Sequence, residues 1–167
     1  IGNATFGGPG IFVGSASDPP QPIVISGSPV PGADNVNFNF FDPGSMSLNS
    51  SGQVAFWANL CCQGPASAWF VGAPGAHPQA RVYSTQPLPA GGTASYPSFG
   101  PRVAALADSG ELAVYIPFVD GSDFQPQIVV AGVDGALRSL AAGGAAVPGD
   151  LGVFGKPNPA IFVTPSG

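Results

Sequence analysis

Charged side chains are scarce in this sequence. Asp, Glu, Lys and Arg make up only 8% of its 167 residues, compared with about 25% in an average soluble domain. Positively charged residues are the scarcest: the sequence contains only Arg81, Arg102, Arg138 and Lys156, and its formal net charge is −5. A nucleic-acid-binding surface needs clustered Lys and Arg to neutralise phosphates. The composition therefore argues against nucleic acid as a partner.

Long apolar runs are also missing. No stretch approaches the ~20 apolar residues of a membrane-spanning helix, so we expect no membrane span. No signal peptide is present, but Ile1 is not an initiator Met, which indicates that the chain has been processed or trimmed. Few charges combined with many Ser, Thr, Asn and Gly suit an exported protein. We expect an extracellular or cell-surface location.

Groups that carry enzyme chemistry are few. His77 is the only histidine, and we interpret it as a plain loop residue, since no oriented partner can be assigned to it. No nucleophile elbow or zinc motif occurs. Asp120 and Asp123, three apart in a loop with Gly121, are the best candidates for a Ca²⁺ site. They lack the further acidic ligands of a full calcium loop, so a hairpin turn is the favoured interpretation, and we expect no enzyme activity, no cofactor and no resident metal.

The two cysteines, Cys61 and Cys62, are adjacent. Neighbouring side chains on a strand point to opposite faces, so a disulfide between them is strained. Two free thiols or a vicinal disulfide is the first interpretation, and a link to another chain is the second. Metal binding is the least favoured, because no second cysteine pair or nearby histidine exists.

Glycine and proline are abundant, with 25 and 20 residues. Such a composition would indicate disorder in a polar chain. Here 44% of the residues are hydrophobic, 12 of them phenylalanine, and the apolar residues form short runs between turn signals. Short apolar runs bounded by Gly and Pro are typical of all-β proteins.

One hairpin-like stretch organises the chain. Residues 48–60 (LNSSGQVAFWANL) predict a strand, a turn at Ser50-Ser51-Gly52 and a second strand of alternating residues, and residues 106–118 (LADSGELAVYIPF) repeat this pattern 58 residues later. Asn49 and Asp108 are interpreted as occupying the same position before the turn. There each side chain accepts hydrogen bonds from backbone amides two residues on, while the turn glycine takes φ > 0.

The segments between these hairpins recur in the same order. Residues 69–72 match residues 11–14 at a spacing of 58, and residues 81–84 match the strand expected at residues 22–26. Units of four antiparallel strands that cannot bury their own faces are typical of propeller blades. We therefore expect one all-β repeat domain over residues 1–167, made of three ~58-residue four-stranded antiparallel propeller-type blades with a hairpin split between the N- and C-termini. The repeat units are residues 1–43, 44–101 and 102–157, and residues 158–167 supply the first strand of an incomplete further unit.

The split hairpin predicts self-assembly. The C-terminal strand resembles the first half of the repeated hairpin, and the N-terminal strand resembles the second half. If the two strands do not meet within one chain, the C-terminal strand of one copy can pair with the N-terminal strand of the next. Two copies would close a six-bladed ring, and a rotation that does not close would give a filament. The predicted assembly interface consists of Ile1, Gly2, Asn3, Ala4, Thr5 and Phe6 with Ala160, Ile161, Phe162, Val163 and Thr164. The alternative is that these ends take no part in assembly.

The repeated motif resembles a family of bacterial exported tandem-repeat proteins, with repeats that read P-x-[IL]-N-x-x-G-Q-V-A-F-x-A-x-L, then G-G-x-G-I-F and a G-x-P-x-P-G turn. Residues 48–60 fit the core of this pattern, residues 8–12 fit the next segment, and residues 27–32 fit the turn. Residues 106–118 depart from it, with Asp108 for the Asn, Glu111 for the Gln and Val114 for the Phe. The resemblance implies a propeller-like fold and a surface location, and it carries no catalytic residue across.

Two functions follow from these patterns. The first is a non-enzymatic, exported structural protein that assembles with itself. The second is an extracellular propeller that binds a glycan or a protein ligand, because aromatic side chains can stack on sugar rings. Most of the aromatic residues are better explained by packing between blades. The aromatic residues considered for stacking on sugars are Phe38, Phe40, Phe41, Trp57, Trp69, Tyr83, Tyr96 and Phe99.

Overall fold

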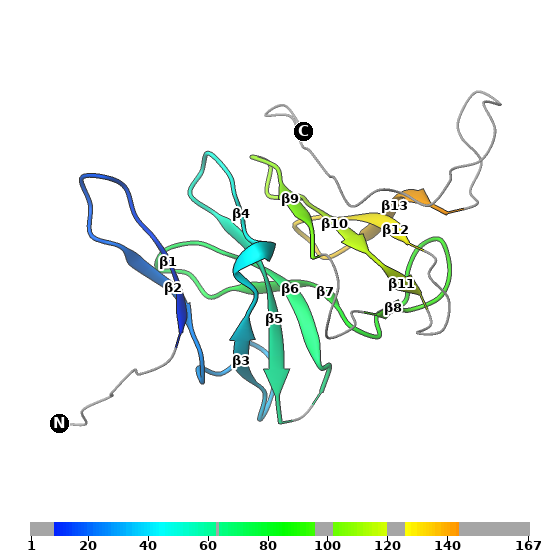
Figure 1. The fold of residues 1–167 in the computed structure, drawn as a ribbon, viewed down its shortest axis with the longest axis horizontal. Coiled ribbons are helices and arrows are strands. Elements are labelled where there is room, and N and C mark those ends of the chain that lie inside the picture. Colours follow the sequence, from blue (N-terminus) through cyan, green and yellow to red (C-terminus); the bar gives the residue numbers. More distant parts are fainter. Residues whose placement is uncertain (1–8, 63, 96–101, 120–125, 144–167) are drawn as a thin grey trace.

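The protein is all-β in the computed structural model (Figure 1), which describes residues 9–62, 64–95, 102–119 and 126–143. These ranges contain several antiparallel sheets, none of them closed into a barrel. The one helical element among them is a single 3-10 turn, η1 (Pro43–Ser45). No helix in the described ranges is long and apolar enough to cross a membrane. The expected all-β class is confirmed.

The first sheet is a two-stranded hairpin. Strand β1 (Gly10–Val13) pairs antiparallel with β2 (Gln21–Ile25). Two prolines, Pro19 and Pro20, lie in the connecting loop, where no ladder hydrogen bond is needed from them.

The central sheet contains five strands: β3 (Asn37–Phe41), β4 (Ser47–Leu48), β5 (Val54–Cys61), β6 (Ser67–Gly72) and β7 (Gln79–Tyr83). The order is β3-β5-β6-β7, and β4 also pairs with β5. Strands β3 and β4 share one edge of β5, since β3 pairs with Ala58–Cys61 and β4 with Val54 and Ala55. Asp42 and η1 join the two: the Asp42 carboxylate accepts a hydrogen bond from the Gly44 amide at 3.0 Å.

The third sheet repeats this plan. Strands β9 (Ala104–Leu106), β10 (Leu112–Ile116), β12 (Gln127–Ala131) and β13 (Leu137–Ala142) lie in the order β13-β12-β10-β9. A short pair, β8 (Ala94–Ser95) with β11 (Phe118–Val119), stands beside it. Strand β11 begins two residues after β10 ends, so β8 and β9 lie along consecutive parts of one extended segment, as β3 and β4 do along β5.

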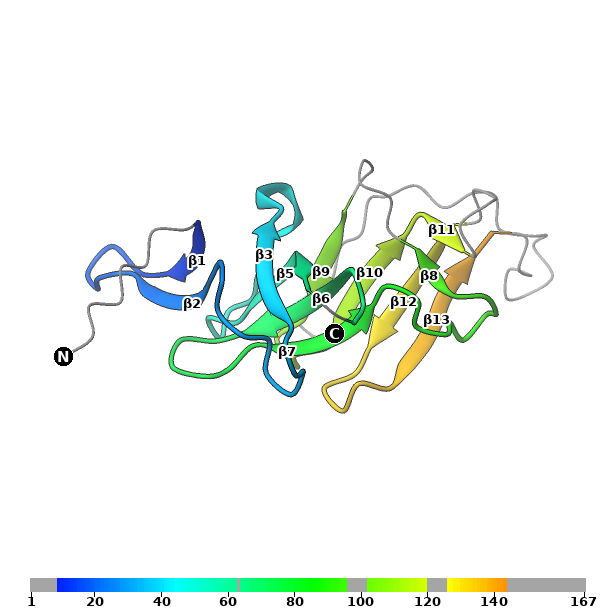
Figure 2. The same cartoon turned by 90° about the horizontal axis from the view of Figure 1, so that it is seen from below.

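The central sheet lies between the other two sheets (Figures 1 and 2) and is apolar on both faces. Alternation along β5 places Phe56 and Ala58 in the core shared with the first sheet, and Ala55 and Trp57 in the core shared with the third. A sheet buried on both faces reads as a nearly continuous apolar run. This is why β5 and β6 carry VAFWANLC and SAWFVG.

The core between the first and central sheets is aromatic. Phe38, Phe41, Phe56 and Phe70 form a cluster of ring contacts, in which Phe56 and Phe70 stack at a centroid distance of 5.5 Å. Trp57 and Trp69, which face each other across β5 and β6, are buried in the other core. The expectation that most aromatic residues serve packing holds for Phe38, Phe41, Trp57 and Trp69. Phe40 is half-exposed, and Tyr96 and Phe99 lie outside the described residues.

Candidate functional site

The residues predicted to form the assembly interface, Ile1–Phe6 and Ala160–Thr164, lie outside the described residues, and so do Asp120 and Asp123. His77 is exposed in the loop between β6 and β7, as expected. The described ranges contain no group of three or more His, Cys, Asp or Glu side chains placed to hold a metal ion. The polar contacts of interest lie instead between the central and third sheets.

The turn of the β4–β5 hairpin lies against the turn of the β9–β10 hairpin. The side-chain oxygen of Asn49, Oδ1, accepts from the backbone amides of Ser51 (3.1 Å) and Gln53 (2.9 Å), so the expected Asx-type turn is present. The side-chain nitrogen of Asn49, Nδ2, donates to the backbone carbonyl of Ala107 in the other turn at 3.0 Å. One side chain therefore both closes its own turn and joins the two sheets.

Asp108 is not the counterpart of Asn49, so that prediction was wrong. Counted back from the turn glycines, Asn49 stands three residues before Gly52, whereas Asp108 stands two before Gly110. The Asp108 carboxylate accepts a hydrogen bond of 2.8 Å from the backbone amide of Ser50 in the other hairpin. This hydrogen bond to the charged form lowers the pKa of Asp108 below its ordinary value. Both turn glycines do take positive φ, +77° and +84°.

Arg102 makes a second connection between the sheets. Its Nη1 lies 2.8 Å from Asp42 Oδ2, and its guanidinium carbon lies 3.8 Å from the centroid of the Trp57 ring. The charge is thus paired on one side and covered by an aromatic face on the other. Nearby, the Leu106 amide donates to Ser47 Oγ at 3.1 Å.

Arg81 makes a third connection. This buried side chain of β7 donates from Nη1 to the carbonyls of Gly132 (3.1 Å) and Val133 in the β12–β13 turn. Burial lowers the pKa of Arg81, and the nearby Asp134 carboxylate opposes that shift. Sequence analysis missed the roles of Arg81 and Arg102. The available signal was the scarcity of cations, since a chain that has few seldom places them without a partner in the fold.

These connections join the central sheet to the third sheet. No nucleophile and base are brought together among the contacts described. We therefore assign them a structural role in fixing the third sheet on the central sheet.

The opposite face of the central sheet presents a different surface. Met46, Leu48 and Phe12 are large apolar side chains with exposed fractions of 42%, 62% and 53%. They border a groove of about 260 Å³ between β1 and β4. We call this surface the β1–β4 groove, and it is lined by Ile11, Phe12, Val13, Gly14, Met46, Ser47, Leu48 and Val54.

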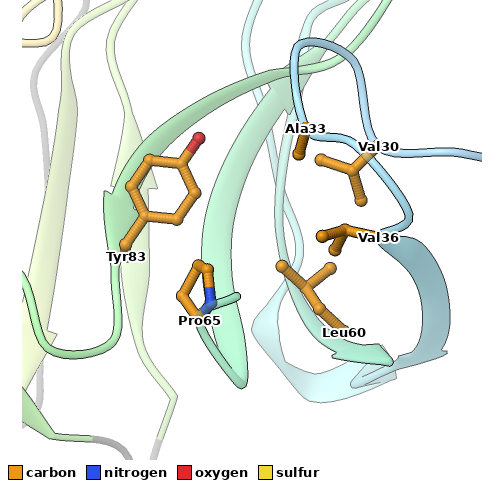
Figure 3. A pocket seen from close by; sticks show the side chains of 6 residues that line it. All are labelled: Val30, Ala33, Val36, Leu60, Pro65 and Tyr83. Carbon is orange, nitrogen blue, oxygen red and sulfur yellow. The ribbon is translucent and has the colours of Figure 1, made fainter. Parts of the chain in front are cut away.

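A separate apolar pocket of about 290 Å³ lies at the other end of the central sheet. Tyr83 and Pro65 stand opposite Val30, Val36 and Leu60 across it (Figure 3). The phenol of Tyr83 is the one hydrogen-bonding side chain in this lining. A sugar needs several convergent polar groups, so this pocket does not favour a glycan.

Comparison with curated proteins and with solved structures gave no match in either case. A family model matches nearly the whole chain, over residues 2–161. The protein therefore belongs to DUF7453, a family of unknown function.

Proposed function

We propose that this protein is a non-enzymatic, exported structural protein whose sheets are propeller-type blades, and that copies assemble through the open side of the first sheet. The support comes from positions 58 residues apart. Strand β2 (Gln21–Ile25) and strand β7 (Gln79–Tyr83) are offset by 58, and the same offset relates the first residues of β5 and β10, Val54 and Leu112. The hydrogen bonds from Asn49 to Ala107 and from Ser50 to Asp108 also span 58 residues.

This offset makes β1 the counterpart of β6. Among the described residues β1 pairs only with β2, whereas β6 lies between β5 and β7, and β12 between β10 and β13. An open strand edge presents backbone donors and acceptors that another strand can satisfy. The place beside β1 corresponds to the place that β5 fills in the central sheet.

The observation that carries the proposal is the exposure of Leu48 and Phe12. Leu106, 58 residues after Leu48, is only 7% exposed because it packs against the central sheet, while Leu48 is 62% exposed. Phe70, 58 residues after Phe12, is fully buried under the first sheet, while Phe12 is 53% exposed. Side chains that are buried between sheets at one position of the stack are therefore uncovered at its other end. Stacked repeats bury such residues with a further repeat.

We propose a second copy of the chain as the source of that further repeat. In the proposed assembly, residues 1–6 extend the first sheet beside β1, and residues 160–164 of the neighbouring copy pair with residues 1–6. The contact joins two different surfaces, so it yields a ring if the rotation closes and a filament if it does not.

The experiment measures mass in solution by light scattering, together with electron microscopy of the native protein. We expect oligomers for the native chain. Leu48→Asp and Phe12→Asp each place a charge in the contact and remove the burial of one large apolar side chain, which contributes about 1.5–3 kcal/mol. Association should weaken by about tenfold or more.

The matched control is Phe40→Asp. Phe40 is as exposed as Phe12, at 51%, but it pairs with Asn59 at the opposite end of β5 from the groove. This variant should assemble like the native chain. Deleting residues 1–6 should abolish assembly while the central and third sheets remain formed. A native chain that stays monomeric at every concentration would overturn the proposal and favour a binding module instead.

A further inference from the structure

The adjacent cysteines have a geometry that regular strand structure does not give. Cys61 is the last residue of β5 and is half-buried, and Cys62 is exposed. Their sulfur atoms lie 2.6 Å apart. This is well inside the ~3.5–4.0 Å at which unbonded heavy atoms attract each other best, and it approaches the ~2.05 Å of a disulfide bond.

The backbone at Cys62 accounts for this approach. Its φ is +89°, in the left-handed region that residues other than glycine rarely adopt. On a continuous strand Cys62 would point to the opposite face from Cys61. The positive φ ends that alternation and brings the two thiols to the same side.

The short distance between the Cα atoms of neighbouring residues determines the kind of disulfide that Cys61 and Cys62 can form. Consecutive Cα atoms are about 3.8 Å apart, whereas the Cα atoms of an ordinary disulfide lie ~4.4–6.8 Å apart. A bond between neighbours is therefore strained, and strained, exposed disulfides are the easily reduced ones. Closure is favoured by proximity and opening by strain, which is the combination that a reversible site requires.

We propose that Cys61 and Cys62 form a reversible dithiol–disulfide site at the tip of the β5–β6 hairpin, with a small-molecule disulfide as its oxidant. The thiolate of one cysteine attacks the oxidant and releases one small thiol, which leaves a mixed disulfide on the protein. The second cysteine then attacks the protein sulfur of that mixed disulfide, the vicinal S–S bond forms, and a second small thiol leaves. Two protein thiols are oxidised and one small disulfide is reduced to two thiols.

The hydrogen bond to Cys61 raises the pKa of the Cys62 thiol above its ordinary value. Because the thiolate is the attacking species, the reaction should quicken as the pH rises toward the alkaline range. This dependence gives the test a second readout.

The test treats the reduced protein with oxidised glutathione and measures its intact mass. The native chain should become lighter by two hydrogens without retaining glutathione, and dithiothreitol should restore the original mass. Cys61→Ser and Cys62→Ser cannot close and should each retain one glutathione. Native protein that keeps glutathione, or that forms a covalent dimer on a non-reducing gel, would overturn the proposal.

Phenylarsine oxide tests the reduced form independently, because its arsenic atom binds two thiolates at once. The native chain should bind it on the order of 100-fold more tightly than either serine variant, since the second sulfur binds intramolecularly. Equal affinities would show that the sulfurs do not act as a pair. Circular dichroism of the three proteins controls for loss of the fold.

Discussion

Several polar residues of this protein act across sheets. Asn49 closes its own turn and also donates to Ala107, while Arg81 and Arg102 extend from one sheet to the next. A buried charge is costly unless it is paired and hydrogen-bonded. Few charged residues are therefore tolerated in these cores, and Arg81 and Arg102 join separate sheets.

The carboxylate of Asp108 should make stability depend on pH. The hydrogen bond from Ser50 lowers the pKa of this carboxyl group in the folded state. The charged carboxylate therefore stabilises the fold at pH values above the ordinary carboxyl pKa of 3.8, and this stabilisation is lost as the pH falls through the folded-state pKa. Asp108→Asn keeps an acceptor for the Ser50 amide but removes the charge. Urea unfolding of both proteins should show a native chain that is more stable at neutral pH, with a difference that shrinks in acid.

Asp34→Asn is the control for that measurement, because Asp34 is an exposed carboxylate in the loop between β2 and β3. A difference between native and Asp108→Asn that stayed constant down to the acid range would contradict the assignment.

Elements were easier to anticipate than contacts between them. Strands β5, β6, β7 and β10 fall within about two residues of the segments expected from short apolar runs, because alternation and turn glycines are local signals. Two short strands, β3 and β4, share one edge of β5, and the sequence patterns did not predict this arrangement. It depends on Asp42 capping η1, and on Ser45 Oγ accepting from the Trp57 amide at 3.0 Å. The contact between Arg102 and Trp57 depends on how two sheets pack, and the contact between the two cysteine sulfurs depends on the backbone conformation of a loop. Local sequence patterns do not predict either contact.

Gly72, at the end of β6, lies close against strand β2. A Cβ atom at this position would lie 2.5 Å from Ile23 Cγ2 of β2. Gly72→Ala should therefore push the first sheet away from the central sheet, at a cost of about 1–3 kcal/mol. Chemical denaturation measures this loss directly.

Gly44→Ala is the matched control, since the nearest atom to its Cβ would be Asp42 Oδ1 at an ordinary 3.4 Å. In an Ile23→Ala background the cost of Gly72→Ala should fall, because the obstructing methyl group is removed. An unchanged cost in that background would mean that the two elements do not meet at this point.

In the part of the chain that the structure describes, the sheets form a stack, and the central sheet contributes to two cores. The first core joins the central sheet to β1 and β2, and the second joins it to the third sheet. Neighbouring side chains of β6, Trp69 and Phe70, belong to different cores although they share one backbone. Stacked sheets coupled in this way resemble repeat arrays, in which the stability of each layer depends on its neighbours.

This coupling predicts that a destabilising substitution in one core will also lower the unfolding transition that is observed in the other core. Both tryptophans of the chain, Trp57 and Trp69, lie in the second core, and Phe70 is fully buried in the first. Phe70→Ala should cost about 3–5 kcal/mol and lower the melting temperature by on the order of 10 °C. Tryptophan fluorescence and far-UV circular dichroism should record the same lowered transition. Leu140→Ala, at an exposed site on β13, should change stability by less than about 0.5 kcal/mol. If the tryptophan transition stayed in place while circular dichroism showed two steps, the cores would unfold separately, and the central sheet would not couple them.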